Sequence, residues 1–181
     1  MAKVTNPSVV ENILKHHMGD SFYRLAPLLQ RFHVGKKTLV GKADVEHGNV
    51  IARFICWVMG FPREGSGIAL QVECDHGATM SWRRKFNGQL MGSTFSLDRD
   101  GLVESLNSLQ LYLRAIESNG ELHYQFYGIK FLGLPLPTFL CPQIVAYERD
   151  NAGKYQFYVA VKLWLIGPVI RYWGILELIE T

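Results

Sequence analysis

The sequence has few cysteines, little charge and no long apolar run. Its three cysteines, Cys56, Cys74 and Cys141, are widely spaced, so neither a disulfide framework nor a zinc knuckle can be read from them. No apolar run reaches the ~18–20 residues that cross a bilayer, and the first residues lack the apolar core of a signal peptide. We therefore expect a reducing cytoplasm, free thiols and no transmembrane segment.

The sequence also lacks the short motifs of catalysis, nucleotide binding and metal binding. It has no GxSxG, GxGxxG or P-loop pattern, and its six histidines show no HxxxH or HxH spacing. The net charge of +3 is too small for a dedicated nucleic-acid binder. We predict no catalytic residue, no metal site, no cofactor and no nucleic-acid partner, and we expect a protein that is not an enzyme.

The composition is that of a folded domain. Hydrophobic residues make up 48% of the 181 residues and charged residues 19%, whereas disordered chains are poor in apolar residues. The length suits one domain with a core of ordinary size. We predict a single domain over residues 1–181, with N-terminal helices in 7–33 and, in 36–181, a sheet that includes a helix at 49–60.

Two short amphipathic helices are predicted near the N-terminus. Ser8 and Glu11 have the spacing of a capping box, and the apolar residues that follow share one face, which predicts a helix over 7–18. Residues 21–32 repeat the pattern, and Pro27 is expected to kink or restart this second helix.

Residues 49–60 are the most apolar stretch of this part of the chain, and Arg53 is their only charge. The apolar stripe is wider than a surface helix needs. A helix on a membrane surface usually carries several basic residues on its polar face, and this one has only Arg53. We therefore predict that this helix is buried against a sheet and ends at Gly60-Phe61-Pro62.

The remaining residues read as strands, because their apolar residues recur at every second position. Asn87-Gly88 is a strong hairpin signal, and the regular spacing of strands and turns is typical of an antiparallel meander. The predicted strands cover residues 36–46, 67–74, 80–86, 89–97, 109–113, 122–127, 143–149, 154–164 and 168–179.

The last two predicted strands carry apolar residues on both faces. An antiparallel strand with one face in water should alternate cleanly, so we expect both faces to touch a helix, a second layer or a cavity. The resulting prediction is an α+β fold. A strongly curved antiparallel sheet of about eight or nine strands, a half-barrel, wraps around the apolar helix 49–60, and the two N-terminal helices lie against an end or edge.

Several short segments together resemble a bacterial family of unknown function. They are Leu25–His33, Gly41, Gly60-Phe61-Pro62, Trp82–Phe86 with Ser93, Gly133–Pro137 with Pro142, Phe157, Gly167 and Tyr172-Trp173-Gly174. The resemblance covers roughly residues 20–178. The family occurs alone or fused to saccharopine-dehydrogenase-like oxidoreductases or multi-pass membrane proteins. Because it has no established activity, the resemblance implies no reaction.

The segment Trp82–Lys85 offers the most chemistry. Trp82 and Arg84 fall on one strand face, so Arg84 is expected to point inward, where a guanidinium can hold a carboxylate or phosphate. Alternatively, Arg84 pairs with an internal acid such as Glu148, because a buried arginine cannot stay unpaired. The predicted ligand-binding residues are Trp82, Arg84, Phe54, Trp57, Tyr124 and Tyr172.

Three functions are compatible with this pattern. The first is non-enzymatic binding of an apolar or lipid-like small molecule in a cavity between the sheet and helix 49–60, with an acidic head on Arg84. The second is a structural or protein-interaction module that packs on a partner or on a second copy of the chain. The third is an enzyme or an enzyme accessory domain that uses Arg84, Tyr124 or His123, without an identifiable catalytic site.

Overall fold

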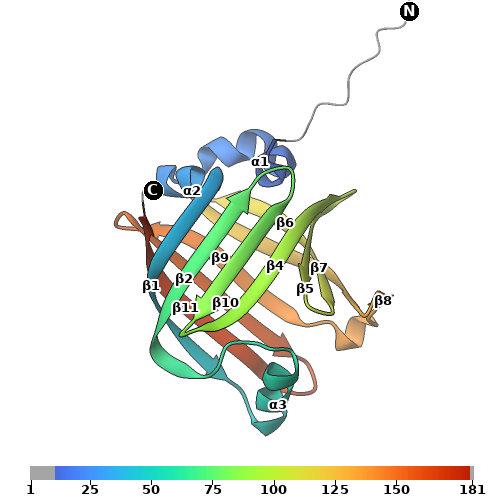
Figure 1. Cartoon of the computed structure of the whole chain (residues 1–181). Helices are drawn as coiled ribbons and strands as arrows, with labels where there is room; N and C mark the ends of the chain where they lie inside the picture. Colours follow the sequence, from blue (N-terminus) through green and yellow to red (C-terminus); the bar gives the residue numbers. More distant parts are fainter. Residues whose placement is uncertain (1–10, 180–181) are drawn as a thin grey trace, which may run out of the picture.

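The strands close into a barrel in the computed structural model, which describes residues 11–179 (Figure 1). Among these residues, ten antiparallel strands follow one another in the order β6-β5-β4-β3-β2-β1-β11-β10-β9-β7, and β7 pairs back with β6. The short strand β8 (Leu134–Pro135) only extends the outer edge of β7. The ring strands are β1 (Gly35–His47), β2 (Gly65–His76), β3 (Met80–Phe86), β4 (Gln89–Asp98), β5 (Gly101–Leu106), β6 (Leu109–Ser118), β7 (Glu121–Phe131), β9 (Gln143–Asn151), β10 (Lys154–Leu163) and β11 (Gly167–Ile179).

Tight turns and one short ladder produce this closure. Asn87-Gly88 and Asn119-Gly120 have positive φ, as two-residue hairpins require, and they reverse the chain between neighbouring strands. The last link is the pairing of Leu122–Tyr124 in β7 with Ala146–Glu148 in β9. Beyond these three residue pairs the two strands have no further pairing, so their ends toward β8 and η2 (Thr138–Leu140) are not joined by a ladder.

The predicted half-barrel wrapped around helix 49–60 is wrong. The sheet is closed, and its inward side chains bury one another without a helix inside. The prediction left out β5, because Glu104 and Ser105 interrupt the apolar alternation of this short strand. With β5 between β4 and β6, the sheet has ten strands and closes through the pairing of β7 with β9.

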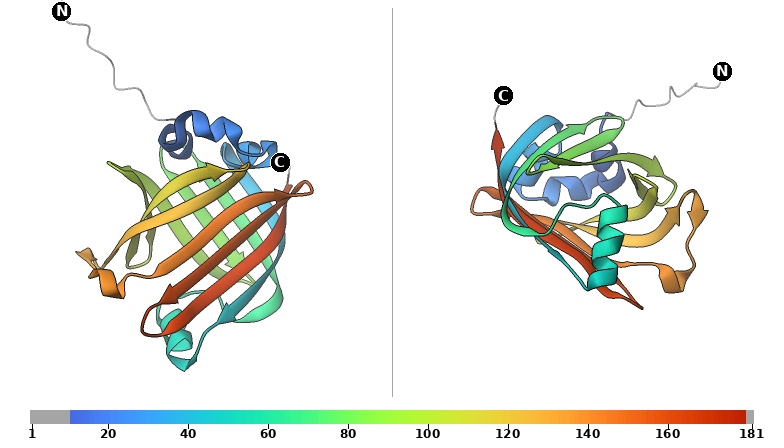
Figure 2. Two further views of the ribbon diagram at one scale, coloured as in Figure 1. Left: turned by 180° about the vertical axis from the view of Figure 1, so that it is seen from behind. Right: turned by 60° about the horizontal axis from the view of Figure 1, so that its bottom comes forward.

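The N-terminal segment closes one end of the barrel (Figures 1 and 2). It consists of α1 (Ile13–Met18), the 3₁₀ helix η1 (Gly19–Arg24) and α2 (Pro27–Phe32). Leu14, Leu29 and Phe32 are completely buried. Two short helices are therefore confirmed, and Pro27 begins the second. The first starts later than predicted, with Asn12 as its N-cap, whereas Ser8 lies outside the described residues.

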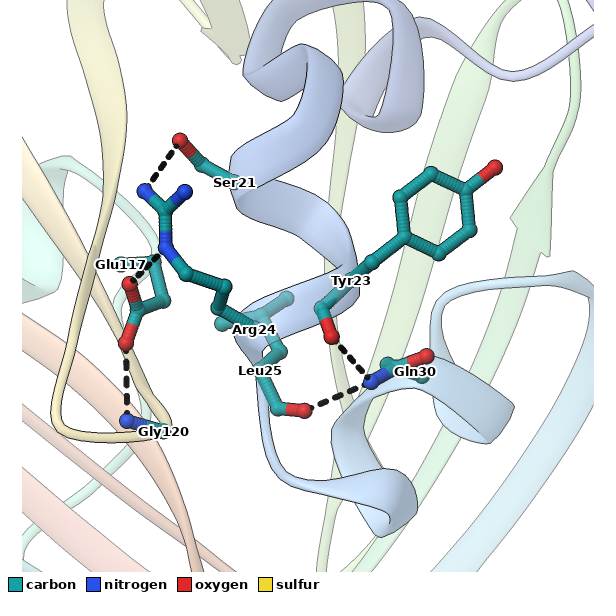
Figure 3. Close-up of polar contacts among 7 residues, drawn as sticks. All are labelled: Ser21, Tyr23, Arg24, Leu25, Gln30, Glu117 and Gly120. Atoms are coloured by element: carbon teal, nitrogen blue, oxygen red, sulfur yellow. Dashed lines mark hydrogen bonds and ion pairs between the residues drawn. The ribbon is translucent and has the colours of Figure 1, made fainter.

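Polar contacts fasten this segment to the barrel rim (Figure 3). Arg24 Nε donates to Glu117 Oε2 at 3.0 Å, and the other carboxylate oxygen of Glu117 accepts from the backbone N–H of Gly120 at 2.9 Å. Gln30 Nε2 donates to the carbonyl oxygen of Leu25 at 2.7 Å. The last contact joins the two helical turns to each other, so the segment docks as one unit.

The apolar helix α3 (Val50–Val58) lies at the opposite end of the barrel and is largely exposed (Figure 1). Of its nine residues, all of which the structure describes, only Ala52 and Cys56 are buried. Phe54 is 62% and Trp57 77% exposed. The predicted burial of this helix is therefore wrong, because the closed sheet offers no open concave face for the helix to cover.

The outer faces of β10 and β11 carry no second layer from the described residues. Tyr158 stacks on Tyr147 of β9 at 5.3 Å between ring centroids, and the Arg171 guanidinium lies 4.8 Å from the Trp173 ring centroid. Ile175 is 42% exposed. The expectation that both faces of these strands are covered is therefore wrong: closure buries the inner face, and aromatic pairs occupy the outer one.

Within residues 11–179, no helix is long and apolar enough to span a membrane.

Because the strands pack closely at Gly174 in β11, we predict that adding a side chain at this position destabilises the protein. A Cβ there would collide with the carbonyl oxygen of Lys42 and approach the Phe157 ring at 2.9 Å. We expect Gly174→Ala to lower the free energy of unfolding by about 1–3 kcal/mol through overpacking. Gly92→Ala is the matched control, since its Cβ would meet nothing closer than 3.7 Å. Urea unfolding measures both, and equal stabilities would contradict the close packing of β1, β10 and β11.

Candidate functional site

The barrel encloses a cavity of about 400 Å³. This volume falls within the range of roughly 300–1,000 Å³ that is usual for small-molecule sites. Most of its lining is apolar and comes from the inward positions of the strands, including Val72, Phe86, Met91, Leu113, Phe157 and Leu176. An apolar occupant of this cavity would contact mostly hydrocarbon side chains.

The cavity extends toward the end that carries α3. Ile55 and Met59 line it there, together with Leu140 of η2, which is 39% exposed. The opposite end, which α1, η1 and α2 cover and which we call the helical end, is closed, since Leu29 and Phe32 are completely buried against the barrel. The cavity is therefore blocked at the α1–α2 end and approaches the surface beside α3 and η2.

Arg84 and Glu104 form an ion pair on the cavity wall. Arg84 Nη2 lies 3.5 Å from Glu104 Oε1, and both residues line the cavity while 12% and 14% of their side chains remain accessible. Nη1 of Arg84 also donates to Ser93 Oγ at 3.1 Å, and the guanidinium lies 4.7 Å from the Trp82 ring centroid. Burial acts to lower the pKa of Arg84, but Glu104 and, to a smaller extent, Tyr172, Cys74 and Tyr155 together raise it more, so the pKa is raised and the arginine stays charged.

A second polar group lies nearer to the helical end. Tyr124 Oη donates to Glu148 Oε1 at 2.8 Å, and His33 Nε2 lies 2.7 Å from Glu148 Oε2. Both Glu148 oxygens are thus engaged, although this residue also contributes to the cavity wall. The alternative that Arg84 pairs with Glu148 is therefore wrong: the partner is Glu104, from the strand that the sequence pattern did not reveal.

Three tyrosines, of which Tyr155 is buried and Tyr124 and Tyr172 are partly buried, add neutral hydrogen-bonding groups to the wall. Burial raises the pKa of Tyr124 and Tyr155, and the nearby Glu148 carboxylate raises both further. Burial also raises the pKa of Tyr172 to about 12, because it outweighs the opposing effect of Arg84. At neutral pH all three phenols are protonated and uncharged, so they can hold an oxygen-bearing ligand but cannot act as bases.

The buried thiols and His76 are unsuited to catalysis. Burial raises the pKa of Cys56 to about 11 and also raises that of Cys74, so neither is a thiolate nucleophile near neutral pH. Burial, together with the smaller effect of the neighbouring His33, lowers the pKa of His76 to about 2. In the part of the chain that the structure describes, no group of three or more His, Cys, Asp or Glu side chains could hold a metal ion.

The structure divides the predicted ligand-binding residues into two groups. Trp82, Arg84, Tyr124 and Tyr172 come together on the cavity wall. Phe54 and Trp57 do not belong to it, because they project from α3 into solvent. The prediction failed for these two because it placed their helix inside the sheet.

Some residues of the wall were missed from the sequence. Glu104 lies between Leu102 and Leu106 at inward positions of β5, and this acid in an apolar row was the signal that could have identified it. Ser93, which binds Arg84, was noted only as part of the resemblance. His123 lies away from the cavity, where its Nε2 is 3.1 Å from Glu121 Oε2.

The fold and site together define a closed antiparallel β-barrel with a largely apolar interior cavity and two paired polar groups on its wall. A family model described as a domain of unknown function, DUF4166, matches residues 25–176, and the chain belongs to this family. The resemblance to a family of unknown function is confirmed to this extent. No significant match was found among curated proteins, and none among solved structures.

The ion pair predicts a large, rescuable loss of stability. Arg84→Met leaves the Glu104 carboxylate without its partner inside the barrel, and we expect about 3–5 kcal/mol less free energy of unfolding. Arg84→Met combined with Glu104→Leu removes both charges and should recover most of the loss. Urea denaturation of these two variants, of Glu104→Leu alone and of the wild type completes the double-mutant cycle. A single Arg84→Met variant as stable as the double variant would contradict the pairing.

The buried phenols predict a loss of stability at alkaline pH. The unfolded chain releases its phenol protons near about pH 10, whereas Tyr172 keeps its proton to a pKa of about 12 in the folded state. The contribution of each such tyrosine to the free energy of unfolding is thus fully present below about pH 10. It falls as the pH rises toward 12, by up to about 1.4 kcal/mol per pH unit. Tyr172→Phe should reduce this slope in urea unfolding between these pH values, while Tyr23→Phe, at an exposed position, should not.

Proposed function

We propose that the barrel binds a lipid-like small molecule without transforming it. The apolar part of the ligand occupies the cavity, and an uncharged polar head contacts the Arg84–Glu104 pair. The observation that carries this proposal is the cavity of about 400 Å³ whose apolar wall is interrupted mainly by buried, paired polar groups. Apolar pockets with a few convergent polar groups are the usual form of small-molecule sites.

The charge balance of the wall favours an uncharged head. Arg84 is already compensated by Glu104, and a ligand carboxylate beside it would bring a second negative charge close to that of Glu104. A hydroxyl or carbonyl group avoids this repulsion. It can accept from a free N–H of Arg84 or donate to Glu104. The acidic head considered from the sequence alone is therefore the less favourable ligand.

The chemistry of the wall favours binding over catalysis. The contact between His33 and Glu148 resembles that of a catalytic base, here His33, with the carboxylate that orients it. However, His33 is completely buried and does not line the cavity. A general base must reach the proton that it removes. The accessory role in an enzyme thus has less support, and no residue is proposed as catalytic.

Four expectations from the sequence accompany this proposal. They are a bacterial source, a cytoplasmic location, one domain over residues 1–181, and relatives fused to saccharopine-dehydrogenase-like or multi-pass membrane proteins. Each stays a prediction beside the family membership.

Filling the cavity tests the binding proposal. Ala146 lines the cavity, so Ala146→Phe should place a ring in it and weaken the binding of N-phenyl-1-naphthylamine, an apolar fluorescent probe, by about tenfold or more. The neighbouring Val145 is 56% exposed and does not line the cavity, so Val145→Phe is the matched control and should bind normally. Equal affinities of both variants and the wild type would refute binding inside the barrel.

Competition tests the head-group chemistry. Oleyl alcohol and oleate have the same chain and differ in the charge of the head. We expect oleyl alcohol to displace the probe at lower concentration than oleate at pH 8, because Glu104 disfavours a second carboxylate. Glu104→Gln removes the competing negative charge and keeps Arg84, so it should reduce or reverse this preference. A wild-type preference for oleate would mean that Arg84 does serve an acidic head.

A further inference from the structure

Large apolar side chains project into solvent at the end of the barrel that carries α3. Ile51, Phe54 and Trp57 of α3 are 58%, 62% and 77% exposed. Phe139 of η2 is 61% exposed, and Trp164 and Leu165, in the turn between β10 and β11, are 73% and 70% exposed. We refer to these six residues as the apolar rim. Single exposed apolar residues are normal, but several on neighbouring loops indicate an interaction surface.

The three elements of the apolar rim are neighbours in the folded chain (Figures 1 and 2). Asn49, the N-cap of α3, donates from Nδ2 to the carbonyl oxygen of Ile166 in the β10–β11 turn at 3.0 Å. Phe139 and Trp164 line one shallow surface hollow. The rim therefore joins separate loops at one end of the barrel, opposite the end that α1, η1 and α2 close.

Charge is distributed unevenly between the two ends. In the segments that form the α3 end, residues 48–64, 87–88, 107–108, 132–142 and 164–166, the only acidic residue is Glu64, which lies 3.3 Å from Arg53. The remaining charge there is Arg63. The turns at the opposite end carry many charges of both signs, among them Asp75, Asp98, Arg99 and Lys154. The α3 end thus carries little charge, with a small positive balance, and can approach a lipid surface of either neutral or anionic headgroups without repulsion.

We propose that the apolar rim docks the barrel onto the surface of a lipid bilayer. Tryptophan and phenylalanine side chains suit the boundary between headgroups and acyl chains. A fluid bilayer also accepts side chains that project from separate loops, whereas a protein partner would have to match their uneven shape. Because α3 has a single basic residue, Arg53, insertion of the rim rather than charge attraction holds the protein there.

The position of the rim is consistent with the binding proposal, although docking does not depend on it. Ile55, Met59 and Leu140 line the cavity from the same α3 and η2 region that carries the rim. A lipid-like molecule could therefore pass between bilayer and barrel without crossing bulk water. This route rests on the proposed function, and docking alone would place the cavity entrance at the membrane surface.

Vesicle flotation tests the docking. We expect the wild-type protein to float with vesicles of phosphatidylcholine alone and with vesicles that also contain phosphatidylglycerol, with little effect of salt. Phe54→Ser with Trp57→Ser removes two large exposed side chains and should weaken partitioning by about tenfold or more. Tyr23→Ser is the matched control, because Tyr23 is an exposed aromatic residue (57%) at the helical end and should not affect flotation.

Three results would overturn the proposal. They are the absence of flotation of the wild type, an equal loss with Tyr23→Ser, and binding confined to anionic vesicles that salt abolishes. In sedimentation velocity, a dimer that Phe54→Ser with Trp57→Ser dissociates would instead assign the rim to a second copy of the chain. Ala146→Phe separates this proposal from the binding function: it should lose the apolar probe and still float.

Discussion

The structure depends on the short antiparallel ladder that joins β7 to β9 and closes the ring of strands. Only three residue pairs make this link, but they convert a meander into a barrel whose inward side chains face one another. Every inward side chain then belongs to one shared interior. The cavity, the buried ion pair and the raised tyrosine pKa values all follow from this enclosure, because each requires groups on opposite walls to exclude water together.

Enclosure also determines how the polar residues are paired. A charge inside the barrel must find a partner, and Arg84 meets Glu104 two strands away while Glu148 is engaged by Tyr124 and His33. Where Arg84 pairs with Glu104, the cavity wall is polar, but the two charges cancel. The interior is consequently better suited to an amphipathic molecule with an uncharged head than to an anion or to a reaction that needs a charged base.

The two ends of the barrel differ because only one receives the N-terminal helices. α1, η1 and α2 bury Phe22, Leu29 and Phe32 against one end, whereas α3 is attached at the other end by few buried residues. The same kind of apolar helix pattern thus gave a buried plug in one case and an exposed surface in the other. For α3 the amphipathic pattern was recognised correctly, but the burial assigned to it was wrong, since no open sheet face remained to receive it.

The sequence by itself determined most of the strands, their turns and the inward direction of Trp82 and Arg84, because period-two alternation and Asn-Gly turns are local signals. It also determined membership of the family, since ordered motifs along the chain carry that information. Only the tertiary structure decided that the sheet closes, that Glu104 is the partner of Arg84 and that Phe54 and Trp57 face solvent. These outcomes depend on which strands meet across the barrel. An apolar helix pattern is the same whether the helix covers a sheet or projects from the rim, so its partner appears only when the chain has folded.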